Sequence, residues 1–333
     1  MNYLLPDHEE ATTVMTTAPS AEPDPFADAW TADKLMAADF PDPKWAVPGV
    51  LCEGVTLLAG PPKVGKSWMS LGLGLSIASG KPAFGSIDTG PAAPVLYLAL
   101  EDTARRLKTR MGKMLGDQAA PHLLTLATQC PPLPQGGDRA IAGWLRGNPA
   151  ARLVVIDVFA KVRGAEPGNV QQYDADYAAV GRAKRVADHF GVAVVLVHHV
   201  RKAVHEDFLA TVSGTNGIAG AADAVLVLER GRNNADGVLH ITGRDVEEAD
   251  HALSFNPDNG AWTMLDGPAI DHTVSDTRAA ILRHLRENSG STPAEIAAAI
   301  GVDAGNVRRT CARMHEAGQL TKDATSRYYA PLI

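Results

Sequence analysis

Residues 60–67 read Gly-Pro-Pro-Lys-Val-Gly-Lys-Ser and match the phosphate-binding pattern G-x-x-x-x-G-K-[ST] at every fixed position. Such a loop needs a strand before it and a helix after it, so that backbone N–H groups and the positive helix end can surround phosphates. Residues 55–59 form a short, partly β-branched apolar run, and apolar residues recur at helical spacing over 68–78. These flanks argue against a chance glycine-rich turn, and the chain is predicted to bind a nucleoside triphosphate.

Two side chains of this loop have separate expected roles. Lys66 would reach the β- and γ-phosphates, and the Ser67 hydroxyl would bind Mg²⁺. ATP and Mg²⁺ are therefore the expected cofactors. The candidate nucleotide-binding residues are Gly60, Pro61, Pro62, Lys63, Val64, Gly65, Lys66 and Ser67.

Apolar runs and amphipathic segments alternate along the next part of the chain. Runs typical of buried strands cover 95–100, 153–156, 192–197, 224–228 and 238–242, with a weaker one at 122–127. Helical patterns cover 66–79, 103–115, 138–147 and 174–190. Continuous apolar strands separated by helices are typical of a parallel sheet covered by helices on both faces. The last strands have short connections, which predicts an antiparallel section at the end of the sheet.

The C-terminal residues carry a different pattern. A helix is predicted over 277–287, a second begins at the capping box Thr292–Glu295 with proline at its first position, and Asp303 would cap a third. Residues 319–321 and 327–330 then form a predicted hairpin. Three short helices followed by a hairpin are typical of a small winged helix-turn-helix domain.

Charge is distributed unevenly along the chain. The 333 residues carry 38 Asp and Glu against 31 Lys and Arg, a net charge of −7. Residues 1–45 hold nine of the acidic and two of the basic side chains, which leaves 29 of each in the remainder. A neutral body neither favours nor excludes nucleic acid as a partner. Residues 1–30 are rich in Ala, Thr, Pro, Asp and Glu and predict a disordered acidic tail, with a partner-binding segment as the alternative.

The cysteines and the N-terminal residues bear on the cellular compartment. Cys52, Cys130 and Cys311 are widely separated and odd in number, which fits neither a disulfide framework nor a zinc site. The first residues lack the basic flank and apolar core of a signal peptide. No apolar run approaches the roughly 18 residues that span a bilayer. We expect a cytoplasmic protein with no membrane partner.

Polar groups follow three of the predicted strands. Glu101 follows the run at 95–100, Asp157 follows 153–156, and His198 and His199 follow 194–197. Ligands of open α/β sheets gather at this edge, so a carboxylate near the metal and a group that orients water are expected here. The alternatives are a turn residue for Asp157, a solvated helix cap for Glu101 and structural histidines.

The order of these residues after the phosphate-binding loop resembles that in the RecA-like ATPases. More narrowly, the pattern is similar to the RepA-type hexameric replicative helicases of plasmids, phages and mobile elements. The resemblance covers about residues 40–265, and relatives with this core also include regulators and recombinases. The matching segments are 57–67, 96–102, 154–157, 195–199, Ser213-Gly214 leading into 221–223, and Gly243-Arg244.

The resemblance implies a catalytic role for several residues. Asp157 would be the second Mg²⁺ ligand, together with Ser67. Glu101 would be the base that polarises the attacking water. The residue after Asp157 is Val158, so no glutamate stands beside Asp157 to act as that base. His199 aligns with the residue that couples the γ-phosphate to DNA-binding loops. Arg244 would be an arginine finger that completes a neighbouring subunit's site.

The match at Arg244 has one departure. Hexameric helicases commonly carry a lysine two residues before the finger, where this chain has Thr242. The alternative is a surface arginine paired with Asp245 or Glu247.

DNA contacts in this fold come from the loops after the Asp157 and His199 strands. Lys161, Arg163, Arg201 and Lys202 are the candidates there, although basic pairs in surface loops are common. In the winged helix, Arg308, Arg309 and Arg313 lie on the third helix, where a recognition helix would present them to duplex DNA. Winged helices also bind proteins, so both partners remain open for this module.

The sequence therefore predicts a fold of the α/β class, a RecA-like P-loop ATPase that forms a homo-oligomer, most simply a hexameric ring. We expect a helicase that translocates on single-stranded DNA. An ATP-switched DNA-binding regulator and a RecA-type recombination mediator are the alternatives. The predicted divisions are a tail over 1–30, the ATPase domain over 31–265, a linker over 266–272 and the winged helix over 273–333.

Overall fold

The computed structural model describes residues 26, 29–164, 172–200, 216–230, 236–316 and 318–330. The chain divides into two compact units, residues 1–42 and 43–333. The predicted tail over 1–30 lies almost wholly outside the described residues. In the described part, no helix is long and apolar enough to cross a membrane.

The first unit contains the short helix α1 (Ala32–Ala37), none of whose residues is buried. Large apolar side chains are exposed in this unit, on α1 and beside it. They are Phe26, Trp30, Leu35, Met36 and Phe40. Pro41 and Pro43, which favour extended backbone, follow the helix.

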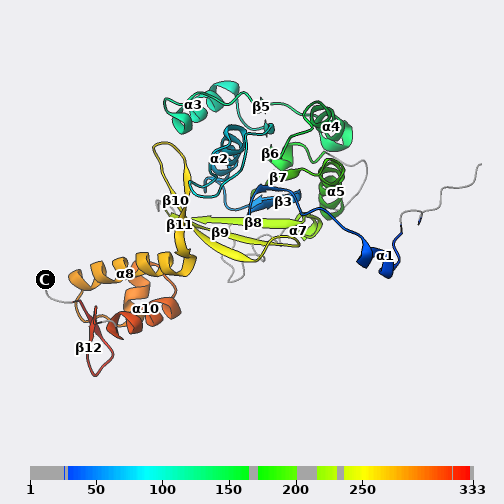
Figure 1. Ribbon diagram of the computed structural model, residues 1–333. Coiled ribbons are helices and arrows are strands. Elements are labelled where there is room, and N and C mark those ends of the chain that lie inside the picture. The colour runs from blue at the N-terminus through cyan, green and yellow to red at the C-terminus, as the bar shows by residue number, and fades with distance from the viewer. Residues whose placement is uncertain are drawn as a thin grey trace, which may run out of the picture. The chain divides into compact units, whose positions relative to one another are not determined.

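The second unit begins with a small hairpin of β1 (Trp45–Val47) and β2 (Leu51–Cys52). The main sheet then has nine strands among the described residues, in the order β11-β10-β9-β8-β3-β7-β6-β4-β5 (Figure 1). The strands are β3 (Gly54–Ala59), β4 (Val95–Ala99), β5 (Leu124–Ala127), β6 (Leu153–Asp157), β7 (Ala193–Val197), β8 (Ala224–Arg230), β9 (Asp236–Gly243), β10 (Ala249–Phe255) and β11 (Trp262–Pro268).

The direction of the strands changes at β8. From β5 to β8 all neighbouring strands are parallel. β8, β9, β10 and β11 are antiparallel neighbours joined by short connections. The sequence prediction of a mostly parallel sheet that ends in an antiparallel section is confirmed.

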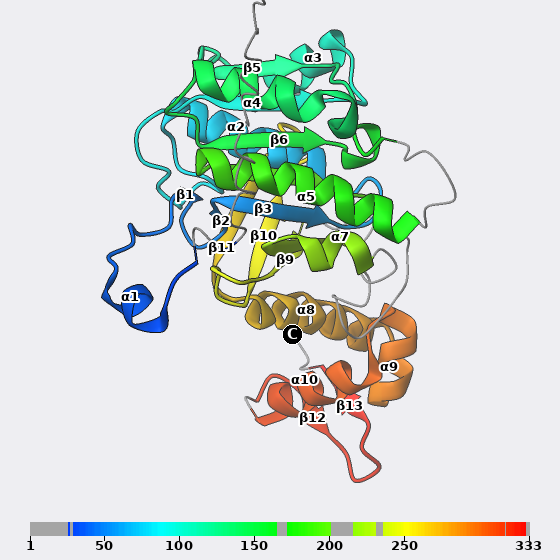
Figure 2. The same cartoon turned by 90° about the vertical axis from the view of Figure 1, so that its right-hand side faces the viewer.

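Helices cover both faces of the parallel section (Figures 1 and 2). The helices are α2 (Lys66–Ser79), α3 (Ala104–Leu115), α4 (Gly137–Gly147), α5 (Gln172–Phe190) and α7 (Asn216–Ala221). Side chains of α2 and α3 share one core with the sheet, and side chains of α4, α5 and α7 share the other. Strand β3 alternates between the two: Leu58 lies in the first core, and Val55 and Leu57 lie in the second. Burial on both faces explains why the strands read as unbroken apolar runs.

The C-terminal module contains α8 (Ala269–Glu287), α9 (Pro293–Ile300), α10 (Ala304–Glu316) and a hairpin of β12 (Thr321–Lys322) and β13 (Tyr328–Tyr329). It has its own apolar core, which includes Ile281, Ile296 and Met314. The predicted capping box is present: Thr292 Oγ1 accepts from Glu295 N at 3.3 Å, and Glu295 Oε2 accepts from Thr292 N at 2.8 Å. Asp303 Oδ2 likewise accepts from Asn306 N at 2.7 Å.

The predicted linker over 266–272 is wrong as a description of the backbone. Strand β11 continues to Pro268, and α8 begins at Ala269 with no residue between them. The helix predicted over 277–287 is thus the second half of a longer one. A Gly-Pro pair indicates a turn in most sequences, and here it falls at the end of a strand that pairs with β10 up to Pro268.

Candidate active site

Four parallel strands bring the predicted site residues to one edge of the sheet. In the register, Ala99 lies opposite Asp157, and Asp157 and Leu58 each lie opposite Val197. Strands β3, β4, β6 and β7 therefore end at the same level. Asp157 is the last residue of β6, and the phosphate loop, Glu101 and the histidine pair follow the ends of the other three strands.

The phosphate loop connects β3 to α2. Gly65 is the N-cap of α2 with a φ of 113°, and Gly60 has a φ of 152°. A Cβ at Gly60 would lie 2.5 Å from the carbonyl oxygen of Leu228, so glycine is required there. Within the loop Val64 is buried, whereas Pro62 and Lys63 are exposed.

Lys66 is held inside the loop. Its Nζ donates to the carbonyl oxygens of Gly60 at 2.6 Å and Pro61 at 2.9 Å, and the residue is 3% exposed. Burial lowers the pKa of the Lys66 ammonium to about 8, and the charge of Asp157 opposes this shift. The ammonium therefore lies where a phosphate could replace carbonyl oxygens as its partner.

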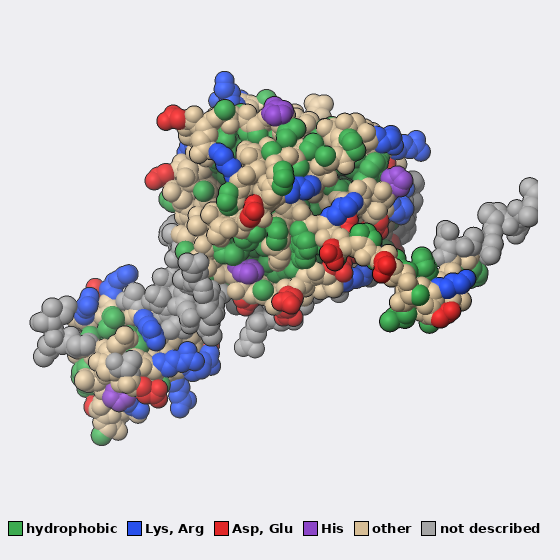
Figure 3. All heavy atoms as spheres, in the orientation of Figure 1, with side chains coloured by type: hydrophobic (Ala, Val, Ile, Leu, Met, Phe, Trp, Pro, Cys, Tyr) green, Lys and Arg blue, Asp and Glu red, His purple; other side chains and the backbone are tan. Residues whose placement is uncertain are grey.

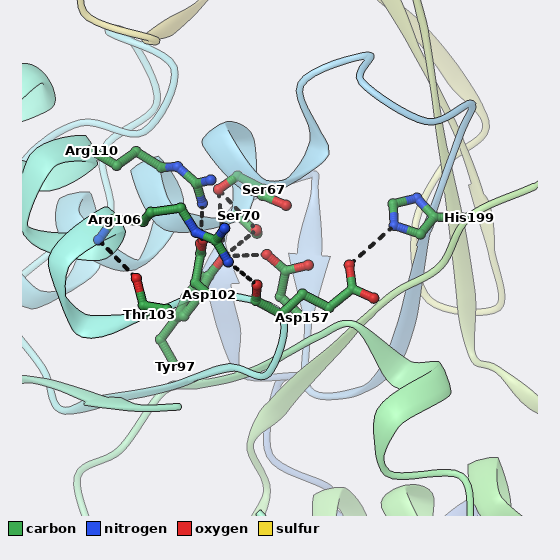
Figure 4. Close-up of polar contacts among 10 residues, drawn as sticks. Ser67, Ser70, Tyr97, Asp102, Thr103, Arg106, Arg110, Asp157 and His199 are labelled. Atoms are coloured by element: carbon green, nitrogen blue, oxygen red, sulfur yellow. Dashed lines mark hydrogen bonds and ion pairs between the residues drawn. The ribbon is translucent and has the colours of Figure 1, made fainter. Parts of the chain in front are cut away.

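Asp157 lies below the loop in a hydrogen-bonded group (Figure 4). Tyr97 Oη donates to its Oδ2 at 2.7 Å, and the same hydroxyl lies 3.1 Å from Ser70 Oγ. Burial raises the pKa of the Asp157 carboxyl, while hydrogen bonds from Tyr97 and Ser67 lower it. The buried Tyr97 hydroxyl has a raised pKa, first through burial and then through the charge of Asp157.

These residues fit a magnesium ion. The Ser67 hydroxyl and the Asp157 carboxylate are adjacent oxygen donors, and Mg²⁺ in nucleotide sites takes one or two such ligands, with water and phosphate oxygens supplying the rest. In the described part of the chain, no group of three His, Cys, Asp or Glu side chains could hold a metal ion without such help. Burial shifts the Asp157 carboxyl toward its neutral form, and a bound Mg²⁺ would stabilise the charged form.

A cavity of about 310 Å³ opens beside these donors. It is lined by Ser67, Glu101, Asp102, Arg106, Arg110 and Asp157. The cavity joins the predicted metal ligands to Glu101, whose side chain is 52% exposed. Glu101 Oε2 lies 3.9 Å from His199 Nε2, so the predicted base and the predicted sensor face each other.

The two histidines differ in their surroundings. His199 is exposed, and its pKa is lowered, first by burial of part of the ring and then by the charge of Lys66. His198 has a buried Nε2 with no hydrogen-bond partner among the described atoms, and burial likewise lowers its pKa. Of the pair, His199 is the one that faces Glu101, and its role as a sensor stays a prediction.

Arg244 lies at the opposite edge of the sheet. It follows β9, and its Nη1 lies 3.5 Å from Asp223 Oδ1; Asp223 also accepts from the backbone N–H of Val55, at the start of β3. The partner is thus Asp223 rather than Asp245 or Glu247. The Arg244 side chain is 64% exposed. Because the phosphate loop follows the other end of β3, Arg244 does not reach the cavity of its own chain.

The candidate DNA-binding residues have varied surroundings. Lys161 is exposed, and Arg163 donates to the buried Asp176 at 2.9 Å. Arg201 and Lys202 lie outside the described residues. Arg308, Arg309 and Arg313 are all exposed on α10, and Figure 3 shows Lys and Arg side chains on the surface of this module.

Sequence reasoning missed Tyr97, which donates to Asp157, and three residues that line the cavity, Asp102, Arg106 and Arg110. A tyrosine in an otherwise apolar strand was the available signal for the first. The i, i+4 spacing of Arg106 and Arg110 was the signal for the arginines. It also missed Trp262 of β11, whose indole Nε1 donates to the carbonyl of Gly65 at 3.2 Å.

Comparison with known families agrees with this geometry. The model of the AAA domain matches residues 19–204, more than half of the chain. The chain belongs to the AAA domain family. A second model, described as a winged helix-turn-helix that binds DNA, matches residues 275–321. No curated protein matches this AAA domain chain in sequence.

Solved structures share the fold of this AAA domain protein at low identity. A solved ATPase domain is 15% identical with a TM-score of 0.53, over 64% of this chain and 85% of that one. A DnaB-like replicative helicase, solved in a study of its interactions with primase, is 16% identical with a TM-score of 0.53, over 64% of this chain and 58% of that one. The chain thus spans little more than half of that helicase. The fold is RecA-like, a mostly parallel sheet between helices, and it carries a C-terminal winged helix.

Proposed function

We propose that this AAA domain protein is an ATP-hydrolysing, ring-forming motor that translocates on single-stranded DNA and acts as a replicative helicase. The observation that carries the proposal is the cavity where Ser67, Asp157 and Glu101 converge beside the buried Lys66. Phosphoryl transfer to water needs such a set: a phosphate-binding lysine, oxygen ligands for Mg²⁺ and a group that orients the water.

The chemistry of the site follows from these positions. Lys66 would exchange its two carbonyl partners for the β- and γ-phosphates of ATP. Ser67 and Asp157 would hold Mg²⁺, which would supply positive charge to stabilise the charge that develops on the phosphates. Glu101 would polarise a water molecule across the cavity, and His199 would register the γ-phosphate through its position next to Glu101.

Assembly into a ring, most simply a hexamer, is supported by the place of Arg244. An arginine finger supplied in trans must be exposed and lie away from its own chain's nucleotide, and Arg244 meets both conditions. Lys161 is an exposed candidate for a phosphate contact with single-stranded DNA after β6. Arg163, Arg201 and Lys202 are proposed in the same role, Arg163 after release from Asp176.

A second candidate function is an ATP-switched regulator that binds duplex DNA. The exposed Arg308, Arg309 and Arg313 on α10 of a winged helix favour it. In the helicase reading, the same module would contact duplex DNA or a partner protein.

Strand separation distinguishes the two. We expect the full chain with Mg²⁺ and ATP to separate a forked duplex, and Glu101→Gln to bind the fork without separating it. Glu248→Gln, an exposed glutamate after β9, is the matched control and should retain activity. Binding of blunt duplex together with failure to separate any fork would favour the regulator over the motor.

A further inference from the structure

The carboxylate of Glu101 has little to hold its direction. The side chain is 52% exposed, and its distance to His199, 3.9 Å, is beyond that of a hydrogen bond. Glu101 lies in the turn between the end of β4 at Ala99 and the start of α3 at Ala104. Its orientation toward the cavity must therefore come from the backbone of this turn.

Arg106 holds that backbone from the first turn of α3. Its Nη2 donates to the carbonyl oxygen of Glu101 at 2.6 Å, and its Nε donates to Asp102 Oδ1 at 2.9 Å. A guanidinium is planar and presents its donors in a fixed fork. Two bonds from one fork fix the Glu101 carbonyl relative to the Asp102 side chain.

The second oxygen of Asp102 is also held. Arg110 Nη1 donates to Asp102 Oδ2 at 2.7 Å, and the Arg110 guanidinium lies 5.2 Å from the ring centre of Trp68. The Asp102 side chain is only 12% exposed. Asp102 is thus a fixed anchor at the cavity wall (Figure 4), and Arg106 connects it to the Glu101 carbonyl.

The rest of the turn is fixed by the neighbouring strand and by the helix. The N–H of Leu100 donates to the carbonyl of Asp157 at 2.6 Å, and Thr103 Oγ1 accepts from Arg106 N at 3.3 Å. The turn is therefore tied at one end to the predicted metal ligand and at the other to α3. Between these ties, the described contact on the Glu101 carbonyl is the one from Arg106.

We propose that Arg106 is a positioning residue for ATP hydrolysis: it holds the Glu101 carbonyl and the Asp102 carboxylate together and so directs the Glu101 carboxylate into the cavity. This inference rests on the proposed function, because it requires Glu101 to act on the attacking water. Reacting groups must be aligned closely, and a misplacement of about 1 Å can lower a rate by about 10²-fold.

If Arg106 only stabilised the fold, its substitution would have a different effect on the kinetics. Its side chain is 57% exposed, and exposed ion pairs contribute little to the stability of a fold. A merely structural arginine here would leave kcat near its wild-type value. A residue that bound nucleotide directly would change KM for ATP as well.

The test is steady-state hydrolysis of Mg·ATP by the full chain, with binding of a non-hydrolysable ATP analogue measured alongside. We expect Arg106→Ala to lower kcat by about 10- to 100-fold while KM and the Kd of the analogue stay within about twofold. Arg106→Lys, which cannot make both contacts at once, should recover only part of kcat. Arg105→Ala, an exposed arginine one position earlier on α3, is the matched control and should behave as wild type.

A double-mutant cycle adds a readout specific to this mechanism. Asp102→Asn should lower kcat in the same way, and the double variant with Arg106→Ala should be little worse than either single variant, because the residues act as one unit. Lys66→Ala should be inactive in the same assay. If Lys66→Ala is inactive but Arg106→Ala has a wild-type kcat, or loses kcat and analogue binding equally, the inference is overturned. A wild-type chain that bound ATP without hydrolysing it would overturn both this inference and the proposed function.

Discussion

Lys66 and Asp157 are both almost inaccessible to solvent, at 3% and 6% exposure. Burial shifts the pKa of each toward its neutral form, and hydrogen bonds from neighbours oppose this at Asp157. A desolvated charge interacts strongly with a ligand of opposite charge. The free site therefore holds a cation and an anion whose charges are complementary to those of a phosphate and of Mg²⁺.

The first prediction concerns pH and Lys66. Its pKa in the free protein is about 8, below the ordinary lysine value, so the ammonium is lost as pH rises through 8. Phosphate binds the protonated form, and binding above this pH must include uptake of a proton. We expect the Kd for Mg·ATP to be flat from pH 6 to 7 and to rise about tenfold per unit well above pH 8. Fluorescence titration measures it, and Lys66→Ala should show no such rise; an unchanged wild-type Kd at pH 9.5 would contradict the prediction.

The second prediction concerns Tyr97. Tyr97→Phe removes the hydroxyl that donates to Asp157 at 2.7 Å and leaves the ring in place. The carboxylate loses a donor that favours its charged form, so its pKa should rise further and its Mg²⁺ affinity should fall. We expect a loss of about 1–3 kcal/mol in the free energy of unfolding, together with a higher Mg²⁺ requirement for hydrolysis. Chemical denaturation and a Mg²⁺ titration test this, and an unchanged Mg²⁺ requirement would argue against Asp157 as a ligand.

At the scale of residues, the phosphate-loop motif and the polar residues at strand ends predicted much of the site. The topology of the sheet fixes the position of these loops and strand ends. The residues predicted in this way are Lys66, Ser67, Glu101, Asp157 and His199. Tyr97 could not be assigned, because a tyrosine in an apolar strand is usually a core residue, and its hydroxyl contact depends on which face of β4 it occupies. The i, i+4 spacing of Arg106 and Arg110 indicates that both lie on one face of a helix, but the contact of Arg106 with the Glu101 carbonyl depends on the geometry of the turn.

At the scale of elements, the antiparallel end of the sheet supports the phosphate loop. The ring of Trp262 on β11 packs against Gly65, where a Cβ would lie 2.9 Å from the indole. Arg230 of β8 lies over the rings of Phe255 and Trp262, at 4.2 and 5.4 Å from their centres. Gly260, in the turn between β10 and β11, packs directly on Trp68 of α2. Elements about 200 residues apart in sequence thus set the loop's shape.

The third prediction follows from the Trp262 hydrogen bond. Trp262→Phe retains an aromatic ring against Gly65 but removes the N–H that donates to its carbonyl. A neutral hydrogen bond of this kind contributes about 1 kcal/mol, so the free energy of unfolding should fall by about that amount, and nucleotide affinity should fall by less than about tenfold. Trp144→Phe on α4, which packs in the other core, is the control for nucleotide affinity. Equal affinity losses in both variants would rule out a specific role for the bond.

Element types were predictable where periodicity was strong. The helices after β3, β4 and β6 and the capping box of α9 were predicted from local signals alone. The junction of β11 and α8 was predicted as a linker because Gly267 and Pro268 usually interrupt regular structure. Pairing with β10 overrides that local preference. Support of the phosphate loop by β11 is a long-range contact, and one sequence contains no signal for it.

At the scale of the whole molecule, the two halves of the proposed catalytic set lie at opposite edges of one sheet. Lys66, Asp157 and Glu101 follow the carboxyl ends of the parallel strands, whereas Arg244 is tied to Asp223 at the amino end of β3. A head-to-tail interface that closes into a ring would bring the second edge of one subunit to the first edge of the next. Hydrolysis would then depend on assembly, because a finger of this kind contributes about 10³- to 10⁵-fold in rate.

The most direct test is hydrolysis of ATP in the presence of single-stranded DNA by wild-type chain, Lys66→Ala, Arg244→Ala and a co-expressed equal mixture of the two variants. In random mixed rings about a quarter of the interfaces contain both an intact Lys66 and an intact Arg244. We predict strong stimulation of the wild type by DNA, almost no activity in either variant alone, and recovery of about a quarter of the wild-type rate in the mixture. A rate that is indifferent to DNA and unaffected by Arg244→Ala would contradict a ring motor with shared sites.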